Sequence, residues 1–317
     1  MTAVAAFLRG ARPRRTPWRV LAWRAARGQA GGWRHAHGAE SREDARAEIL
    51  APARAGGLAD GDLVRVAGPA HESPEHWFVA PGGRAVRLPG VAATVARGDL
   101  DAPDEFFGRW AVAVGDDWAE AWRLCPQGDW FLHMAERLGV EPRARLRLAA
   151  GAVARAARLV AGRTSAGEMV RAAAVATARS ARGVAALVAG KAPAKEYQGV
   201  WDGARFLGVW QAGRSAELAA ARQELDDARL RGADAEASRA ALEAASWLVK
   251  AADAEAPEDL GEAVRFAAAA EEALGAAADA RRGASRPPGW ASRAQAVAFA
   301  AKLPLRAALD AHAGGRP

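Results

Sequence analysis

The residues best suited to chemistry lie in one short stretch of the chain, WAEAWRLCPQGDWFLHMAERLGV. Within it, Cys125, Asp129 and His133 follow one another at intervals of four residues. On one continuous helix they would share a face, as a thiol nucleophile, its base and an orienting acid do. Pro126 and Gly128 break that helix between the cysteine and the other two residues. We therefore predict no catalytic residue here, and we expect Asp129 to cap the next helix while Cys125 fills space.

A second candidate chemistry is metal binding by histidine. His35 and His37 lie on the same face of a predicted strand, at a spacing that can hold a metal ion. His71 and His76 are the residues that could complete such a site. No strong motif ties a carboxylate or a histidine to the pair, and surface histidines on hairpins are common. We therefore predict no metal site and no cofactor.

A third candidate chemistry is contact with nucleic acid. Residues 1–38 contain eight arginines and no acidic residue. The candidate contacts are Arg12 and Arg14, in a predicted flexible basic arm of residues 1–14, and Arg15 directly after it, and the tryptophans that follow could stack on bases. Those tryptophans also alternate as strand residues do, which favours a place in the core. Nucleic-acid binding is therefore the alternative function.

Acidic residues dominate a later part of the chain, residues 217–279, which contain fifteen acidic and six basic residues. The net charge of the chain is +7, but its basic and acidic residues are concentrated in different regions. Such an uneven distribution of charge indicates which partners the chain can bind and says little about its fold. An acidic helical surface suits a basic partner. Glu224, Asp226 and Asp227 are our candidate interface residues.

Several classes of function lack their motifs. The sequence has no phosphate-binding loop and no G-x-S-x-G, H-E-x-x-H or G-x-G-x-x-G pattern. Its single cysteine excludes an intramolecular disulfide and a cysteine-built zinc site. No run of eighteen apolar residues occurs, and no apolar segment of an export signal follows Arg14 and Arg15. We expect a cytoplasmic, non-enzymatic protein that does not bind membranes.

Strands are the first elements that must position these residues. Large and polar residues alternate across a glycine-rich turn in residues 17–25 and 31–38, which predicts a hairpin. Ser41 begins a predicted helix that buries Ile49 and Leu50. Further strands are expected at residues 62–68, 76–83, 84–90 and 109–114. This order predicts a small α+β domain over residues 15–114.

Helices make up the rest of the chain. Asp116 or Asp117 is expected to cap a short helix, Gly139 to end a later one in a Schellman motif, and Pro142 to begin an alanine-rich helix. Further helices are expected at about residues 165–190, 195–212, 215–231, 234–252, 257–282 and 290–302. Short loops favour antiparallel neighbours, so we predict a larger all-α helical bundle over residues 115–317.

The segment AWRLCPQGDWFLHMAERLGV, continued by RLRLAAGAVARAARLVAG, resembles a bacterial family of immunity proteins of polymorphic toxin systems. In that family, an AW…CP.GDW element precedes a short apolar helix, a Leu-Gly turn and an alanine-rich helix. The residues that match are Trp122, Cys125, Pro126, Gly128, Asp129, Trp130 and Leu138. The resemblance covers residues 115–190, and His133 stands where the family has an aromatic or large apolar residue. It implies a helical, non-enzymatic protein that binds a partner protein, such as a toxin or effector.

The tryptophans of this stretch are expected to serve structure. Trp118, Trp122 and Trp130 would pack around the Pro-Gly break as a local core. The leading hypothesis is thus a protein-binding module, an immunity or adaptor protein that occludes its partner. The alternative is a nucleic-acid-associated protein that uses the basic N-terminal region.

Overall fold

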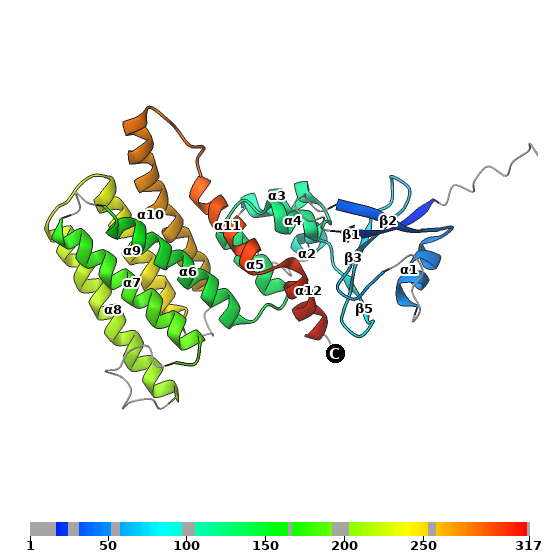
Figure 1. The fold of residues 1–317 in the computed structure, drawn as a ribbon, viewed down its shortest axis with the longest axis horizontal. Coiled ribbons are helices and arrows are strands. Elements are labelled where there is room, and N and C mark those ends of the chain that lie inside the picture. Colours follow the sequence, from blue (N-terminus) through cyan, green and yellow to red (C-terminus); the bar gives the residue numbers. More distant parts are fainter. Residues whose placement is uncertain are drawn as a thin grey trace, which may run out of the picture. The chain divides into compact units, whose positions relative to one another are not determined.

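The computed structural model of this chain describes residues 17–24, 32–51, 58–96, 105–163, 167–191, 203–252 and 258–315. The described residues form two compact units, one up to Ala121 and the other from Trp122 to Gly315 (Figure 1). The first unit contains a five-stranded sheet and short helices, and the described part of the second contains helices alone. The predicted α+β fold, a small sheet-containing part followed by a larger helical part, is confirmed.

The sheet is antiparallel throughout, with the strand order β2-β1-β3-β4-β5. Its strands are β1 (Trp18–Arg24), β2 (Gly32–Ala39), β3 (Leu63–Ala67), β4 (Glu75–Val79) and β5 (Ala85–Leu88). The predicted hairpin of the first two strands is confirmed, with a bulge between Val20 and Leu21. Strands β2 and β5 form the two edges of the sheet.

One face of the sheet is packed against the helix α1 (Arg42–Leu50). Ser41 caps this helix as predicted, because its hydroxyl oxygen accepts a hydrogen bond of 3.0 Å from the backbone N–H of Asp44. Ile49 is fully buried in the core between α1 and the sheet. Leu50 is 57% exposed, and its predicted burial was wrong, since successive helical side chains point about 100° apart and Ile49 takes the inward direction.

Three short helices follow the sheet, α2 (Val91–Ala96), α3 (Glu105–Val114) and α4 (Trp118–Leu124). The strand predicted at residues 109–114 is wrong, because this segment is the second half of α3. Phe107 and Ala111 are buried four residues apart, which is helical spacing, whereas the Ala-Val alternation after them imitates a strand. Asp117 caps α4 as predicted, since its Oδ1 accepts a hydrogen bond of 3.0 Å from the backbone N–H of Glu120.

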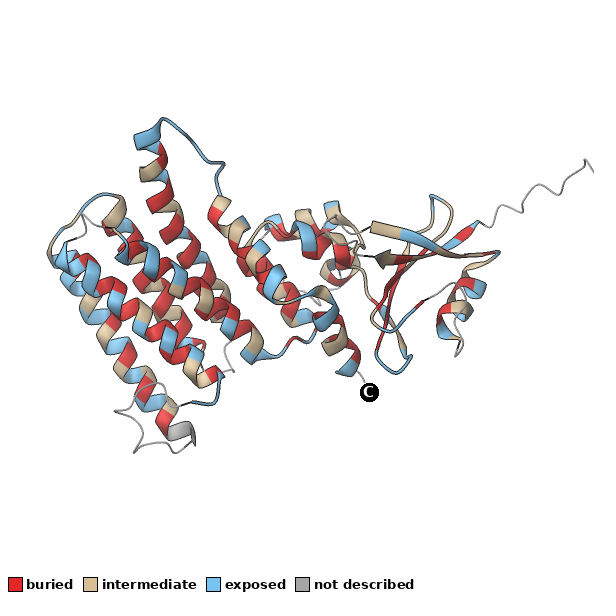
Figure 2. Ribbon diagram, in the orientation of Figure 1, coloured by how far each residue is buried: buried red, intermediate tan, exposed pale blue. Residues whose placement is uncertain are grey.

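The second unit begins within α4 and consists of packed helices. They are α5 (Gly128–Arg137), α6 (Pro142–Ala161), α7 (Glu168–Val188), α8 (Gly203–Asp227), α9 (Ala233–Lys250), α10 (Glu258–Arg282), α11 (Trp290–Lys302) and α12 (Leu305–Gly314). Helix α9 packs against α6, α7, α8 and α10 (Figure 1). Many of the buried positions in these helices are alanines, whose small side chains let the backbones approach closely (Figure 2). None of the described helices has the length and apolar character needed to cross a bilayer.

The turn after α5 is the predicted Schellman motif. Gly139 has a φ of +74° and donates a hydrogen bond of 2.8 Å to the carbonyl of Glu136. The next N–H, of Val140, donates one of 3.0 Å to the carbonyl of Ala135. Pro142 then occupies the start of α6, also as predicted.

A single long helix, α8, replaces the two helices predicted at residues 195–212 and 215–231, of which residues 195–202 lie outside the described part of the chain. Gly213 does not end a helix there, because Trp210 and Leu218 lie on one buried stripe that continues past it. A glycine inside a helix costs about 1 kcal/mol, which this burial outweighs. The last helix, α12, was not predicted from the sequence.

Candidate functional site

The tryptophans of the stretch WAEAWRLCPQGDWFLHMAERLGV belong to the cores of the two units. Trp118 is buried in the first unit, where its indole N–H donates a hydrogen bond to the carbonyl of Pro89. Trp122 is buried in the second unit, where its indole N–H donates a hydrogen bond of 3.1 Å to the carbonyl of Leu303. Its ring centre lies 4.4 Å from that of Phe131. These side chains hold structure together.

Cys125 is a buried thiol between α4 and α5. Its Sγ donates a hydrogen bond of 3.3 Å to the carbonyl of Gln127. Burial raises the pKa of this thiol to about 12, and the Asp129 charge adds to that shift. A cysteine reacts as the thiolate, so at neutral pH this side chain is a space-filling group and a poor nucleophile.

Asp129 does not cap α5, so that prediction was wrong. Gln127 occupies the N-cap position, with extended backbone and without a side-chain cap hydrogen bond, and Asp129 lies inside the first turn. The carboxylate is 4% exposed, and its Oδ2 accepts a hydrogen bond of 3.3 Å from Arg265 of α10. Burial raises the pKa of Asp129, while the Arg265 charge opposes that shift. The aspartate therefore ties α5 to α10.

Gly128 is the first residue of α5, which begins two residues earlier than a cap at Asp129 would allow. A Cβ at this position would lie 2.8 Å from a methyl carbon of Val264 and 3.1 Å from Gln295, so only glycine lets α5 approach α10 and α11 this closely. Its backbone N–H donates a hydrogen bond of 3.2 Å to the hydroxyl of Ser292 on α11. Gly128 and Asp129 of the motif are thus the residues against which α10 and α11 pack.

The histidines are spread over the first sheet. His35 is exposed and His37 half-buried on the edge strand β2, whereas His76 is buried on β4 and His71 is exposed in a loop. In the described part of the chain, no group of three or more His, Cys, Asp or Glu side chains is placed to hold a metal ion. The structure does not assemble the four histidines into one site.

The acidic candidate residues lie at the C-terminal end of α8. Glu224, Asp226 and Asp227 are all exposed there. Asp226 accepts a hydrogen bond of 2.7 Å from Nε of Arg239, so part of the negative charge is already neutralised within the chain. The basic candidates Arg12, Arg14 and Arg15 lie outside the described residues.

Sequence reasoning missed a basic stripe on α6. Arg143, Arg147 and Arg158 are exposed and make no ion pair within the described residues, and α6 has no acidic residue at all. At 100° per residue these three arginines lie within about 60° of one another around the helix axis. Their intervals of four and eleven residues are the sequence signal, hidden by the general abundance of arginine.

Helix α6 and its neighbour α7 also carry exposed apolar side chains. Leu159 on α6 is 42% exposed, and on the neighbouring helix α7 Met169 is 37% and Val175 50% exposed. We define the α6–α7 surface as the three arginines Arg143, Arg147 and Arg158 together with Leu159, Met169 and Val175. It combines cationic hydrogen-bond donors with apolar area on two helices that pack along each other.

Comparison of this chain with protein-family models, with curated proteins and with solved structures found no match.

Proposed function

We propose that the chain is a non-enzymatic protein-binding module, of the immunity or adaptor type, whose helical unit occludes an acidic partner protein. The observation that carries this proposal is the α6–α7 surface, which combines three exposed arginines that make no ion pair among the described residues with exposed apolar side chains on the same two helices. The resemblance of residues 115–190 to the immunity family supports it. The partner would be a toxin or effector protein, encountered in the cytoplasm.

Arginines that make no ion pair within the described part of the chain suit a protein interface for a physical reason. A guanidinium presents five N–H donors in a planar fork that fits carboxylates, so an acidic partner can form paired hydrogen bonds with it. The apolar neighbours add burial and exclude water from those bonds. Long-range attraction between the basic stripe and an acidic partner also speeds their encounter.

The acids at the end of α8 have a smaller part in this proposal. Glu224 and Asp227 can orient the partner through a basic patch, whereas Asp226 is already paired with Arg239. Exposed charges of this kind act mainly on the association rate. We therefore place the main contact on the α6–α7 surface.

Nucleic-acid binding is the second candidate function, because the same acid-free helix could follow a line of phosphates. Binding of that kind depends steeply on salt concentration and vanishes after nuclease treatment. The exposed Leu159, Met169 and Val175 have no role on a phosphate backbone, and they favour the protein partner.

The test compares two variants that each remove two positive charges from exposed helix positions. Arg147→Gln/Arg158→Gln changes the α6–α7 surface, and Arg281→Gln/Arg282→Gln changes the end of α10. Each tagged variant, and the unmodified chain, is used to capture partners from the native host with and without nuclease.

We expect a nuclease-resistant protein partner that the α6 variant loses and the α10 variant keeps. Equal capture by both variants would remove the α6–α7 surface from the proposal. Loss of every partner after nuclease treatment would favour the nucleic-acid function instead.

A further inference from the structure

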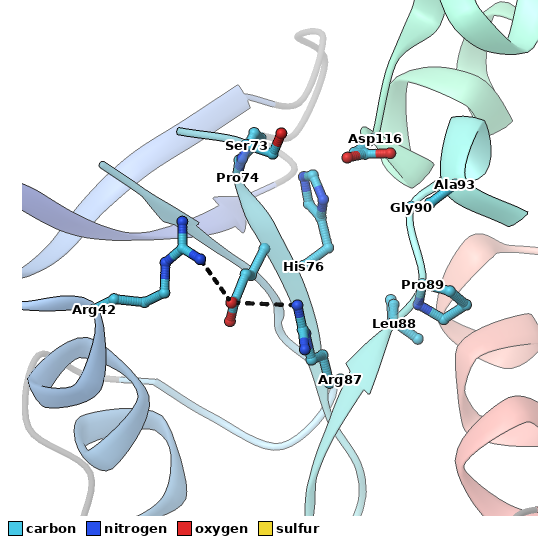
Figure 3. A pocket seen from close by; sticks show the side chains of 11 residues that line it. Arg42, Ser73, Pro74, His76, Arg87, Leu88, Pro89, Gly90, Ala93 and Asp116 are labelled. Carbon is cyan, nitrogen blue, oxygen red and sulfur yellow. Dashed lines mark hydrogen bonds and ion pairs between the residues drawn. The ribbon is translucent and has the colours of Figure 1, made fainter. Parts of the chain in front are cut away.

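The first unit contains a pocket that the proposed function does not use. It has a volume of about 440 Å³ and lies where β4 begins and β5 ends, next to α1, α2 and the turn before α4 (Figure 3). This volume falls within the range of about 300–1,000 Å³ that is usual for small-molecule sites. Its polar lining comes from residues far apart in the sequence, among them Arg42, His76, Arg87 and Asp116.

One wall of the pocket is basic. Glu75 is buried there and ion-paired with three arginines, at 3.8 Å from Arg42, at 3.3 Å from Arg87 and in close contact with Arg46. Burial raises the pKa of Glu75, but the Arg46 hydrogen bond and the three positive charges outweigh it, so the pKa is lowered and the carboxylate stays ionised.

Among the residues that line the pocket, this wall has two arginines, Arg42 and Arg87, and one carboxylate, Glu75. Arg42 also pairs with Glu72, at 2.5 Å, which does not line the pocket. The Nε of Arg42 is buried and has no hydrogen-bond partner among the described residues. Arg87 extends from the edge strand β5 with its side chain 58% exposed, so its guanidinium can turn toward a ligand. This wall suits an anionic group.

The opposite wall carries the side chains of His76 and Asp116. His76 is 2% exposed, and both of its ring nitrogens lack a partner in the described part of the chain. Its side chain points toward Asp116 and away from Arg42 and Arg87 (Figure 3). The Oδ1 of Asp116 is likewise buried without a partner among the described residues. Buried polar atoms are rarely left unpaired, so several around one cavity indicate a ligand site.

The imidazole of His76 is uncharged at neutral pH. Burial lowers the pKa of His76 to about 4, with the Asp117 charge opposing and the Arg65 charge adding to that shift. A neutral imidazole offers one donor and one acceptor. The negative charge of Asp116 is therefore the charge that this wall presents to a ligand.

Gly90 shapes this wall. A Cβ on Gly90 would lie 1.8 Å from Oδ1 of Asp116, so the carboxylate lies directly against the backbone that follows β5. Any other residue at this position would displace Asp116 from the wall.

We propose that this pocket binds a small zwitterion, an amino acid or short peptide, with its carboxylate at Arg42 and Arg87 and its ammonium group at Asp116. Opposite charges on the two walls call for opposite charges within one ligand. A polyanion such as a nucleotide would satisfy the arginines but would be repelled by Asp116. The apolar part of the ligand would lie on Pro74, Leu88 and Ala93.

The test measures ligand binding to the full chain. Thermal shift followed by titration calorimetry is carried out with each proteinogenic L-amino acid, a set of dipeptides, and inorganic phosphate and AMP as polyanion controls. Arg87→Ala and Asp116→Asn remove one recognition group from each wall. Arg34→Ala is the matched control, because Arg34 is exposed on the opposite edge strand, β2, away from the pocket.

We expect at least one amino acid or dipeptide to bind, with its Kd raised at least tenfold, or about 1.4 kcal/mol, by each pocket variant and unchanged by Arg34→Ala. Failure of the whole panel to bind at millimolar concentration would overturn the proposal. Binding of phosphate or AMP but of no amino acid or dipeptide would also overturn it. A Kd that is the same for Arg87→Ala as for the unmodified chain would do so as well. Circular dichroism establishes that each variant is folded, and Arg87→Ala decides the matter if Asp116→Asn does not fold. None of these outcomes depends on the partner protein of the helical unit.

Discussion

The two units of this chain differ in the surroundings of their buried polar groups. The first unit buries them around a cavity, where Arg42, His76 and Asp116 have polar atoms without partners among the described residues. In the second unit, closely packed helices bury carboxylates that pair with arginines, as Asp129 does with Arg265 and Glu271 with Arg155, while Arg143, Arg147 and Arg158 of α6 are exposed. Large side chains on strands can leave space between elements, whereas alanine lets helices pack closely. This difference suggests a small ligand for the first unit and a macromolecular partner for the second.

The largest expected effect tests whether the Trp122 ring is a core element of the helical unit. Trp122→Ala removes a ring packed on Phe131 and the donor to the Leu303 carbonyl, so we expect a loss of about 3–5 kcal/mol in the free energy of unfolding. Urea unfolding followed by far-ultraviolet circular dichroism measures it. The control is Trp23→Ala, a half-buried tryptophan of β1, which should cost clearly less. Equal losses would contradict a core role for Trp122.

The next effect tests the close approach of helices that Gly128 permits. Gly128→Ala places a methyl group against Val264 and Gln295, and such overpacking typically costs about 1–3 kcal/mol. Gly208→Ala is the matched control, because a Cβ on this exposed glycine of α8 meets nothing within 4 Å. There the same change should stabilise the helix by about 0.5–1 kcal/mol. If both substitutions changed the free energy of unfolding in the same direction, helix propensity and not close packing would decide the outcome.

How far the sequence predicts this molecule depends on how local the determining contacts are. Ser41, Asp117 and Gly139 cap or end their helices as predicted, because each acts within a few residues of its own position. Asp129 was assigned to a cap for the same local reason. The assignment failed because α5 begins at Gly128, which packs against Val264 and Gln295, more than a hundred residues later.

The candidate sites were hard to predict for the same physical reason. The pocket joins Arg42, His76, Arg87 and Asp116, which only the strand order and the helix after it bring together. The α6 stripe lies on a single helix and could have been found from its intervals of four and eleven residues. The unpaired state of its arginines depends on the neighbouring helices, and no sequence pattern reveals it.

A third prediction concerns pH and the buried carboxylate of α5. Because burial raises the pKa of Asp129, the folded chain takes up a proton more readily than the unfolded chain, and stability should increase as the pH falls toward the ordinary aspartate pKa near 3.8. Asp129→Asn should remove this part of the pH dependence and leave the Tm at pH 7 equal or higher. Thermal unfolding of both chains from pH 4 to pH 8 tests this. A variant that is less stable at pH 7 would contradict this prediction, because it would show that the contact with Arg265 outweighs the cost of burying the carboxylate.

A fourth prediction concerns the thiol. With its pKa raised to about 12, Cys125 should resist alkylation in the folded chain at pH 8 and react at once in denaturant. Cys125→Ser should leave partner capture unchanged. Mass spectrometry of the alkylated protein gives the extent of reaction. Rapid modification of the folded chain would mean that the thiol is open and ionised, and it would reopen a catalytic role for this stretch.

The smallest expected effect concerns the acids at the end of α8. Reversing Glu224, Asp226 and Asp227 to lysine should cost at most about 0.5 kcal/mol of folding stability at each exposed position. If these acids orient a basic patch of the partner, the triple variant should bind more slowly, with a weaker salt dependence and an almost unchanged dissociation rate, because exposed charges act mainly by steering.

The α6 variant Arg147→Gln/Arg158→Gln should instead raise the dissociation rate, since its arginines are proposed to lie within the contact. Surface plasmon resonance with the captured partner at several salt concentrations separates the two effects. If the acid variant dissociates faster while the α6 variant does not, the contact lies at the end of α8, and the α6–α7 surface only steers the encounter.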